Sequence, residues 1–438
     1  MKKILQPLTA NQSLKGECQV PPDKSIAQRS VILAGIAEGE SIITNFPVAG
    51  DPQSTLGIME KLGLEVKREQ NILRIKGSGI YGLKEPSQIL DCGNSGTGFR
   101  LIMGLLAGHP AGFFSVLSGD QSLSKRPMKR VTEPLKSLGA EIWGRENASK
   151  APICLIGKSL NGGFIQTKVV SAQLKSALLL AGLNAQKPLT IKETTASRNH
   201  TEIMLQSFGA KFKQIDELTS QIEPSSLIST EINIPGDFSS AAFLITAALI
   251  IPNSELTIKQ IGLNPTRIGF LEVIKKMGAN IQIDYNQQSS SQESIGNITV
   301  KSSSLKAVCL EGSLIANIID EIPIICLLAA RAQGITEIKN AEELRVKESD
   351  RLTAMFEVLS GLGIKVVEKP DGLIIEGQPD KPFDTTQKTF EAYHDHRIAM
   401  TIKIASLICN NEIELNGSEW ASISFPNFYD LLDNLKTK

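Results

Sequence analysis

The phrase Lys61-Leu62-Gly63-Leu64-Glu65-Val66 recurs along this chain with its glycine in the same place. An apolar residue, a glycine and then alternating apolar and polar residues are typical of a helix that passes through a left-handed cap into a half-buried strand, because glycine alone adopts that cap without a Cβ clash. Four more copies surround Gly139, Gly209, Gly278 and Gly363. The glycines are 76, 70, 69 and 85 residues apart, which indicates a repeated structural unit.

A chain of 438 residues leaves room for six such units. The sixth would end at the C-terminus, where residues 428–438 predict a helix with no strand after it. We expect residues 3–8 to supply the missing strand, so that the two ends of the chain meet. The length exceeds what one core supports, and six units suggest two domains of three units each.

The composition is that of an ordinary soluble globular protein. Its 46 basic and 46 acidic side chains give no net charge and exclude a general attraction to nucleic acid or anionic membranes. The longest apolar run, residues 241–251, is far shorter than the ~20 residues that span a bilayer. Residues 1–7 contain no apolar stretch typical of a signal peptide, so we expect a cytoplasmic protein.

Cysteine and histidine patterns predict no metal site. The six cysteines form no Cys-x-x-Cys pair and no zinc-ligand spacing, which favours reduced and mostly buried thiols. The chain has only four histidines. Two of them flank an aspartate in His394-Asp395-His396-Arg397, but no third ligand lies at a suitable spacing. His396 is better interpreted as a hydrogen-bond donor or proton carrier, and Arg397 as an anion ligand.

Helix starts form two series in register with the repeat. Turn or capping signatures precede the second helix of each unit, at residues 51–54, 126–128, 198–202, 264–267, 347–351 and 424–427. A second series precedes the first helix, at residues 22–25, 93–98, 170–173, 236–240, 320–323 and 394–397. The predicted unit is therefore strand and helix repeated twice and then a strand pair, a β-α-β-α-β-β arrangement with polar residues at helix N-termini.

Helix N-termini suit anions, because they present unpaired backbone N–H groups and about half a positive charge. Ordinary capping, worth ~1 kcal/mol per residue, explains any single Ser, Asp or Asn equally well. Capping does not explain the cations beside the caps. Arg126 opens one helix, Lys347 and Arg351 stand one turn apart, and Ser25 and Arg29 share a helix face. A solvated helix face or internal ion pairing remains the alternative for each of these groups.

Two acidic positions are candidates for proton transfer. Asp320 lies between apolar runs, where a carboxylate needs a cationic or hydrogen-bonding partner. Glu348 is flanked in sequence by Lys347 and Arg351. Carboxylates among cations suit chemistry on a multiply anionic substrate, although ion-paired surface acids would give the same pattern.

Together these motifs resemble the 5-enolpyruvylshikimate 3-phosphate synthase family, enolpyruvyl transferases of the shikimate pathway, over nearly the whole chain. The most specific motifs are those at residues 23–25, 93–97, 125–128, 345–352 and 395–400. Residues 171–175, 198–202 and 264–267 look like the second sequence class of that family. The resemblance implies an α/β fold of two domains, residues 1–19 with 235–438 and residues 20–234, whose helix N-termini face an interdomain cleft.

The resemblance also implies substrates and roles. The 5-hydroxyl of shikimate 3-phosphate would add to phosphoenolpyruvate, with Asp320, Glu348 and Lys24 as catalytic residues and no metal or organic cofactor. Shikimate 3-phosphate would be held by Lys24, Ser25, Arg29, Ser171, Ala172, Gln173, Arg198, Asp320 and Lys347. Phosphoenolpyruvate would be held by Lys24, Asn94, Gly96, Arg126, Gln173, Arg351, His396 and Arg397. The expected partners are these small molecules alone, with no nucleic acid or membrane, and the expected state is a monomer that closes on its substrates.

Departures from the family pattern and two rival interpretations bear on this resemblance. Ala172 stands where the other class has a second phosphate-binding serine, and Ile423 stands where the second class has a lysine, so one phosphate contact must be absent or supplied elsewhere. The rival family of UDP-N-acetylglucosamine enolpyruvyl transferases generally carries a cysteine or aspartate before an Arg-Pro, and residues 119–127 contain no cysteine. A non-catalytic repeat scaffold that binds phosphorylated partners would not require Asp320 and Glu348. No residue of the fourth unit receives a role.

Overall fold

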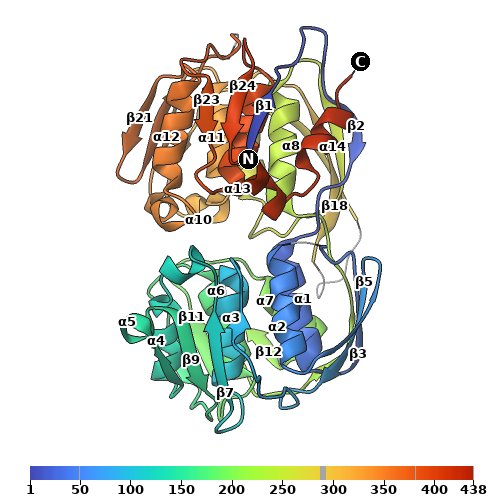
Figure 1. Ribbon diagram of the computed structural model, residues 1–438, viewed down its shortest axis with the longest axis vertical. Helices are drawn as coiled ribbons and strands as arrows, with labels where there is room; N and C mark the ends of the chain where they lie inside the picture. The colour runs from blue at the N-terminus through green and yellow to red at the C-terminus, as the bar shows by residue number, and fades with distance from the viewer. Residues whose placement is uncertain (49, 287–292, 380, 438) are drawn as a thin grey trace. The chain divides into compact units, whose positions relative to one another are not determined.

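The computed structural model describes residues 1–48, 50–286, 293–379 and 381–437 (Figure 1). The chain divides into two compact units. Unit 1 contains Met1–Pro21, Gly236–Gln287 and Ser294–Lys438, whereas unit 2 contains Pro22–Pro235 and Gln288–Glu293. The chain therefore leaves unit 1 after Pro21 and returns to it after Pro235.

One sheet of unit 2 shows the repeated arrangement. Its strand order is β6-β7-β9-β8, with β6 and β7 parallel and the remaining neighbours antiparallel. One helix connects the parallel strands, and a second helix leads into the final strand pair, as the β-α-β-α-β-β prediction requires. In chain order the elements are β6 (Leu90–Asp91), α3 (Gly96–Ala107), β7 (Phe114–Ser118), α4 (Lys129–Ser137), β8 (Glu141–Gly144) and β9 (Lys150–Ile156).

The other two sheets of unit 2 follow the same plan, with one exchange of strands. The first repeat consists of α1 (Lys24–Ile36), β3 (Ala37–Thr44), α2 (Asp51–Lys61), β4 (Glu65–Glu69) and β5 (Ile72–Ser78), and its outer strand is supplied later by β14 (Leu227–Ile228) and β15 (Glu231–Asn233). The third consists of β10 (Gly163–Gln166), α6 (Ala172–Gly182), β11 (Leu189–Lys192), α7 (His200–Ser207), β12 (Phe212–Gln214) and β13 (Thr219–Ile222). Short helices η1 (Leu123–Lys125) and α5 (Arg145–Ala148) complete the unit.

Unit 1 contains the remaining three repeats. The fourth is β2 (Lys15–Cys18), α8 (Phe238–Ile250), β16 (Glu255–Gly262), α9 (Gly269–Lys276), β17 (Asn280–Tyr285) and β18 (Ile295–Lys301). The fifth is β19 (Cys309–Leu310), α10 (Leu314–Ile318), α11 (Ile322–Ala330), β20 (Ile335–Ile338), η2 (Glu342–Val346), α12 (Arg351–Gly361), β21 (Val366–Lys369) and β22 (Gly372–Glu376). The sixth is β23 (Thr389–Glu391), α13 (His396–Ser406), β24 (Ile413–Asn416), η3 (Ser418–Ile423), α14 (Phe428–Asn434) and β1 (Lys2–Leu5).

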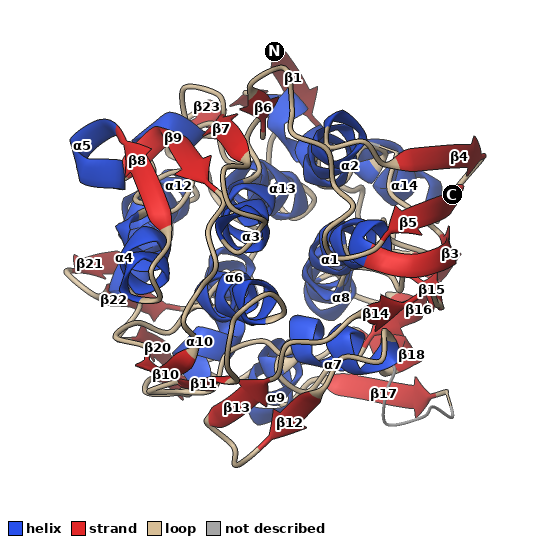
Figure 2. Ribbon diagram, turned by 90° about the horizontal axis from the view of Figure 1, so that it is seen from below, coloured by secondary structure: helices blue, strands red, loops and turns tan. Residues whose placement is uncertain are grey.

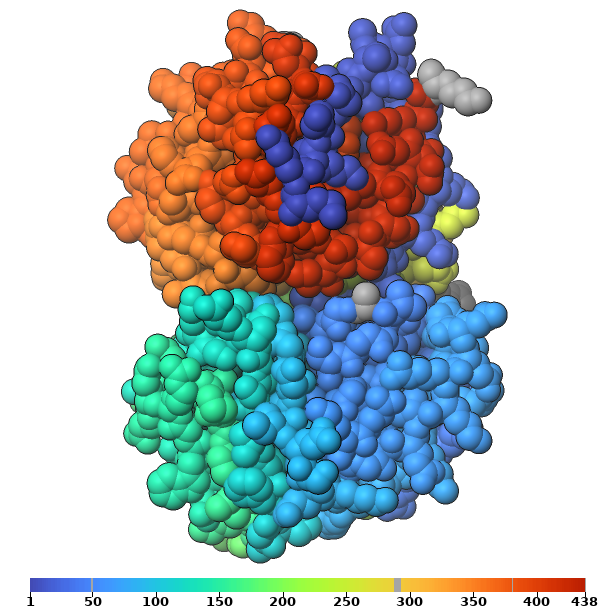
Figure 3. Space-filling model, in the orientation of Figure 1, coloured from blue at the N-terminus to red at the C-terminus, as the bar shows by residue number. Residues whose placement is uncertain are grey.

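The N-terminal strand completes the last repeat. Strand β1 pairs antiparallel with β24, Leu5 opposite Ile413, and the N-terminal ammonium lies 2.6 Å from Glu419. Figure 3 shows this N-terminal segment in blue against the red C-terminal surface of the same unit. The predicted meeting of the two chain ends is confirmed. Helix α14 ends at Asn434, before the C-terminal residues that the sequence prediction included.

The repeated glycines adopt the predicted conformation. All five have φ between 75° and 98°, and each follows a helix and precedes a strand. At Gly63, the following amide of Leu64 donates to the carbonyl of Met59 at 3.0 Å, which closes the end of α2. This cap turns the chain from α2 into β4 and recurs in four further repeats.

Each unit has its own hydrophobic core between helices and sheets. In unit 2, α1, α3 and α6 lie side by side in the interior, with β3, β5 and β7 toward the edge (Figure 2). In unit 1, every residue of α8 and of α11 is buried. In the described parts of the chain, no helix is long and apolar enough to cross a membrane.

Candidate active site

Polar residues cap most of the helices that carry predicted site residues. The carboxylate of Asp23 accepts from the amides of Ser25 and Ile26, at 2.7 and 2.9 Å, at the start of α1. Ser95, Ser171, Asp237, Asp350 and Asp395 likewise cap α3, α6, α8, α12 and α13. Capping is therefore a real role of these residues. The side chains beside the caps determine what else each helix terminus can bind.

Arg29 is held beneath the N-terminus of α1. Its Nε donates to Thr201 at 2.7 Å, Nη2 to Ser176 at 2.9 Å, and Nη1 to the carbonyl of Ser25 at 2.8 Å. Burial lowers the pKa of Arg29 to about 10. Ser176 also donates to the carbonyl of Ala172. Arg29 thus links the starts of α1, α6 and α7, and brings the predicted ligands Ser25 and Ala172 into one hydrogen-bonded group.

The glycine-rich start of α3 faces two arginines. Arg126 donates from Nη2 to the side-chain oxygen of Asn94 at 2.7 Å, and Arg100 donates from Nη1 to the carbonyl of Gly96 at 3.1 Å. A Cβ on Gly96 would lie 2.8 Å from Nη1 of Arg100 and 3.3 Å from Nη1 of Arg126. The absence of a side chain at Gly96 therefore leaves room for both guanidinium groups at this helix terminus.

Gln173 joins α6 to α3. Its side-chain oxygen accepts from Arg100 at 2.7 Å, and its amide donates to Thr97 at 2.9 Å. Lys24 of the neighbouring helix lies 3.3 Å from Asp51, with 29% of its side chain exposed. Arg198 is half-buried and follows Ser197, whose carbonyl accepts from Lys175. Unit 2 thus contains a polar surface formed by the N-termini of α1, α3 and α6 and the loop before α7.

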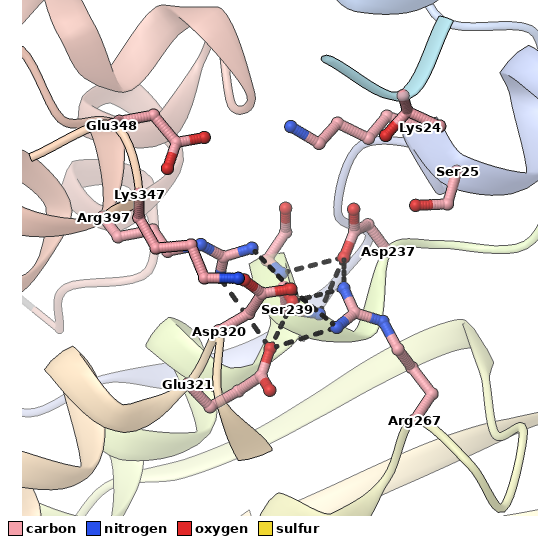
Figure 4. A network of polar contacts seen from close by, with 12 residues as sticks. Lys24, Ser25, Asp237, Ser239, Arg267, Asp320, Glu321, Lys347, Glu348 and Arg397 are labelled. Carbon is pink, nitrogen blue, oxygen red and sulfur yellow. Dashed lines mark hydrogen bonds and ion pairs between the residues drawn. The ribbon is translucent and has the colours of Figure 1, made fainter. Parts of the chain in front are cut away.

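Asp320 lies among three arginines in unit 1. Its carboxylate oxygens are 3.6 Å from Arg351, 3.5 Å from Arg267 and 3.9 Å from Arg397. The Asp320 side chain is 18% exposed, whereas those of the arginines are 1–7% exposed. Figure 4 shows this carboxylate at the centre of the polar network. A carboxylate with this many cations is favoured in its ionised form, as an acceptor of protons must be.

Arg351 is oriented by acidic residues on both sides. It donates from Nε to Asp395 at 2.7 Å and from Nη2 to Glu348 at 2.8 Å. Burial alone would lower the pKa of Arg351, but Asp395 and Glu348 outweigh it and raise that pKa above its usual value. Acidic side chains therefore compensate the positive charge of Arg351 beside Lys347. This agrees with internal ion pairing, the alternative given for these cations in the sequence analysis. These contacts also place the predicted proton carrier Glu348 beside Arg351.

Lys347, His396 and Arg397 complete the group in unit 1. Lys347 lies 3.5 Å from Glu343, and burial lowers the pKa of Lys347 while Asp320 partly opposes that effect. The backbone amide of Arg397 donates to the cap residue Asp395 at 2.9 Å. His396 is buried in the first turn of α13. The structure thus brings the charged side chains of Asp320, Lys347, Glu348, Arg351 and Arg397 together, and places His396 next in sequence to the cap residue Asp395.

The fourth repeat also contributes to this group, contrary to the sequence interpretation. Arg267 contacts both Asp320 and Glu321, each at 3.5 Å, and Glu321 is fully buried. The sequence signal was the arginine at the end of Asn264-Pro265-Thr266-Arg267, beside a predicted helix start. Its role could not be assigned because its partners are distant in sequence: Ser239 lies 28 residues before it and Asp320 lies 53 residues after it.

The described residues contain no group of three or more side chains suited to hold a metal ion. His394, the first histidine of the motif at the start of α13, packs edge-on against Trp420 with ring centroids 4.9 Å apart. Its ring is therefore in contact with an aromatic side chain.

Comparisons with known proteins agree over the full length of the chain. Residues 8–432 match the family described as EPSP synthase (3-phosphoshikimate 1-carboxyvinyltransferase). Curated relatives with that enzyme name include proteins of Desulforudis audaxviator, 45% identical over 98% of this chain and 99% of the relative, and of Bacillus cytotoxicus, 43% identical over 97% and 98%.

Solved structures show the same likeness. An EPSP synthase from Acinetobacter baumannii has a TM-score of 0.88 and 36% identity, with all of both chains covered. The enolpyruvyl transferase NikO from Streptomyces tendae, 16% identical with a TM-score of 0.78 over 99% of this chain and 96% of that chain, shares the fold. The predicted α/β fold and family are confirmed. The chain belongs to the EPSP synthase (3-phosphoshikimate 1-carboxyvinyltransferase) family of transferases.

Proposed function

We propose that this chain transfers the enolpyruvyl group of phosphoenolpyruvate to the 5-hydroxyl of shikimate 3-phosphate and releases phosphate. The reaction belongs to the shikimate pathway, which leads through chorismate to aromatic amino acids. The observation that carries the proposal is the position of Asp320 among Arg267, Arg351 and Arg397 in a chain of this family. A proton acceptor beside several guanidinium groups suits addition of a hydroxyl to an anionic substrate.

Shikimate 3-phosphate binds chiefly at the helix N-termini of unit 2. Ser171, Ala172 and Gln173 form the start of α6, where backbone amides and a hydroxyl suit a phosphate. Ser25 and Arg29 belong to the neighbouring group at α1, and the half-buried Arg198 precedes α7. The proposed set is Lys24, Ser25, Arg29, Ser171, Ala172, Gln173, Arg198, Asp320 and Lys347.

Phosphoenolpyruvate carries a phosphate and a carboxylate, which match bidentate guanidinium groups. Arg126 and Gly96 belong to the start of α3, and Arg351 and Arg397 surround Asp320. The proposed set is Lys24, Asn94, Gly96, Arg126, Gln173, Arg351, His396 and Arg397. Neither substrate set requires a metal or an organic cofactor.

The chemistry proceeds by addition and elimination. Asp320 accepts the proton of the 5-hydroxyl of shikimate 3-phosphate while the hydroxyl oxygen bonds to C2 of phosphoenolpyruvate. Glu348 or Lys24 gives a proton to C3. The tetrahedral intermediate then loses phosphate from C2 and a proton from C3, so that the double bond re-forms. The pairing of Glu348 with Arg351 at 2.8 Å supports a role for this carboxyl group near the reacting carbon atoms.

We further propose that residues 1–19 with 235–438, and residues 20–234, are two domains that close on shikimate 3-phosphate and complete the second anion site. The enzyme is a cytoplasmic monomer whose partners are its two small-molecule substrates. Calorimetric titration tests closure. Phosphoenolpyruvate should bind much more tightly after saturation with shikimate 3-phosphate, and equal affinity with and without it would contradict closure.

Phosphate release tests the function itself. The purified protein should release phosphate only when both substrates are present, and mass spectrometry should show the enolpyruvyl ether. UDP-N-acetylglucosamine in place of shikimate 3-phosphate should release none, which separates this activity from that of the rival enolpyruvyl transferases. An absence of phosphate release with both substrates would overturn the assignment.

A further inference from the structure

Arg267 connects three segments of unit 1 beneath the proposed proton acceptor. It lies in the loop between β16 and α9, and its side chain is 4% exposed. Its Nη2 donates to Ser239 in the first turn of α8 and lies 3.6 Å from the cap residue Asp237. Its Nη1 lies 3.5 Å from Asp320 and from Glu321, directly before α11. One guanidinium group therefore fixes the start of α8 relative to the segment that carries Asp320 (Figure 4).

The other cations around Asp320 are proposed substrate ligands. Arg351 and Arg397 face it from α12 and α13, at 3.6 and 3.9 Å. Lys347, which precedes α12, also interacts with its charge. The acidic neighbour is Glu321, which pairs with Arg267 and Arg397. Of the three arginines beside Asp320, Arg267 is the one that belongs to neither proposed set of substrate ligands.

The fixed partners of Arg267 give it a different role from the other two arginines. Ser239 donates to Glu321, and Glu321 is fully buried, so the contacts that orient Arg267 are internal to the protein. When Arg351 and Arg397 bind the phosphate and carboxylate of phosphoenolpyruvate, their guanidinium groups are shared with the ligand. Arg267 then remains beside Asp320 as a cation that is shared only with protein groups, Glu321 and Asp237.

We propose that Arg267 is a positioning residue that keeps the carboxylate of Asp320 ionised and oriented to accept the proton of the attacking hydroxyl. This inference rests on the proposed function. Because Arg267 acts through Asp320 without touching a substrate, its removal should change turnover and the acidic side of the pH profile, and change substrate binding little.

The test is the pH dependence of kcat in Arg267→Gln and Arg267→Lys. A nearby cation favours an ionised carboxylate, so Arg267→Gln should move the acidic limb up by about one pH unit. Its maximal kcat should fall about 10- to 100-fold through loss of alignment, with both KM values within about threefold of wild type. Arg267→Lys keeps the charge, so its acidic limb should stay at the wild-type position while kcat recovers in part.

Arg331→Gln is the matched control. Arg331 follows the other end of α11 and donates to the backbone carbonyl of Gln378 at 2.9 Å, so the variant removes an arginine of the same unit that is not paired with Asp320 in the described network. Its acidic limb should not move. An unmoved limb in Arg267→Gln, or an equal shift in Arg331→Gln, would overturn the proposal.

Two further variants keep the test decisive. Should Arg267→Gln not fold, Ser239→Ala removes the hydroxyl that orients Arg267 and leaves every charge in place. Its kcat should fall several-fold with both KM values unchanged, and a wild-type kcat would refute the positioning role. Asp320→Asn tests whether the acidic limb of the kcat profile arises from ionisation of Asp320. If the acidic limb of the kcat profile persists in Asp320→Asn while the wild-type protein turns over both substrates, this inference is overturned. The proposed reaction is then unaffected.

Discussion

Arg351 donates from Nε to Oδ2 of Asp395 at 2.7 Å, and the two side chains are 1% and 0% exposed. This pair joins the first residue of α12 to the cap of α13, and so holds the fifth and sixth repeats together. Asp395 also accepts from Ser349 and from the amide of Arg397. A proposed phosphoenolpyruvate ligand is therefore part of the framework of unit 1.

Removal of the Asp395 charge should destabilise the protein in a pH-dependent way. Burial alone would raise the pKa of Asp395, but Arg351 outweighs it and the pKa is lowered. Its stabilising contribution is then present above the usual aspartate pKa of ~3.9 and is lost as the pH falls through the lower folded value. Asp395→Asn should lose about 3–5 kcal/mol at pH 7 because Arg351 stays buried without its main partner.

Urea unfolding between pH 2 and 7 measures this effect. The difference between wild type and Asp395→Asn should shrink toward pH 2. Asp430→Asn, at an exposed position of α14, should stay within about 0.5 kcal/mol of wild type at pH 7. A constant difference across the whole range would show that the charge of Asp395 does not stabilise unit 1.

Replacing Lys403 by methionine should stabilise the protein. Lys403 lies buried in α13, and burial, with help from Lys436, lowers its pKa to about 8. A lowered lysine pKa means that the folded state binds fewer protons than the unfolded state, so a penalty is fully present below pH 8 and disappears as the pH rises toward 10.5. Lys403→Met should gain on the order of 3 kcal/mol at pH 7.

The gain of Lys403→Met should vanish above about pH 10.5. Thermal and urea unfolding of the same samples at pH 7 and pH 10.5 measure it. Lys365→Met, whose side chain is 78% exposed in wild type, should change stability by less than about 0.5 kcal/mol at pH 7. An unchanged midpoint for Lys403→Met at pH 7 would contradict the burial penalty.

Lys175→Met should both destabilise unit 2 and weaken shikimate 3-phosphate binding. Nζ of Lys175 lies 2.7 Å from Glu193 and from Glu202, with each of the three side chains 5–6% exposed. Loss of the ammonium leaves two buried carboxylates without their cation, which costs about 3–5 kcal/mol. The same group bonds the carbonyl of Ser197, so Arg198 should also lose its fixed position.

Glu202→Gln is the comparison for Lys175→Met. Burial raises the pKa of Glu202 despite its pairing with Lys175, so loss of this negative charge is tolerated better than loss of the cation. We expect a destabilisation of no more than about 2 kcal/mol by urea unfolding, with Glu193 still paired to Lys175. Equal losses of stability in Lys175→Met and Glu202→Gln would contradict the expectation that the cation matters more than this carboxylate.

Gly96→Ala should raise the KM for phosphoenolpyruvate about tenfold and leave the KM for shikimate 3-phosphate within about twofold. The added Cβ would lie 2.8 Å from Arg100 and 3.3 Å from Arg126, so both guanidinium groups must move. Nη1 of Arg100 must shift and Arg126 must give by a few tenths of an ångström, and loss of one charged hydrogen bond costs about 1.5–3 kcal/mol. Steady-state kinetics with each substrate varied provides the measurement.

The control for Gly96→Ala is Gly57→Ala in the interior of α2, where an added Cβ meets no atom within 4 Å. It should leave both KM values unchanged and stabilise the fold by about 0.5–1 kcal/mol, because alanine favours a helix over glycine. Wild-type KM values in Gly96→Ala would show that this glycine is not required for phosphoenolpyruvate binding.

The sequence by itself determined the repeat and the ends of its helices. Gly63 and its four counterparts were recognisable because a left-handed cap needs glycine, a requirement that is local to a few residues. The position of β1 beside β24 was also predictable, since the last repeat lacked a strand. The sequence did not predict that β14 and β15 join the sheet of the first repeat, or that β2 joins that of the fourth. Short edge strands carry a weak sequence signal.

Only the tertiary structure decided which charges meet. Lys347, Glu348 and Arg351 were candidates from their spacing along one helix start, but the pairing of Arg351 with Asp395 depends on a residue 44 positions away. Arg267 received no role from the sequence because its partners belong to other segments. Ser239 lies in α8, and Asp320 lies just before α11. Cap and turn patterns reflect short-range sterics, whereas the balance of buried charges depends on how distant segments pack, and that balance distinguishes an arginine that binds a substrate from one that orients an acid.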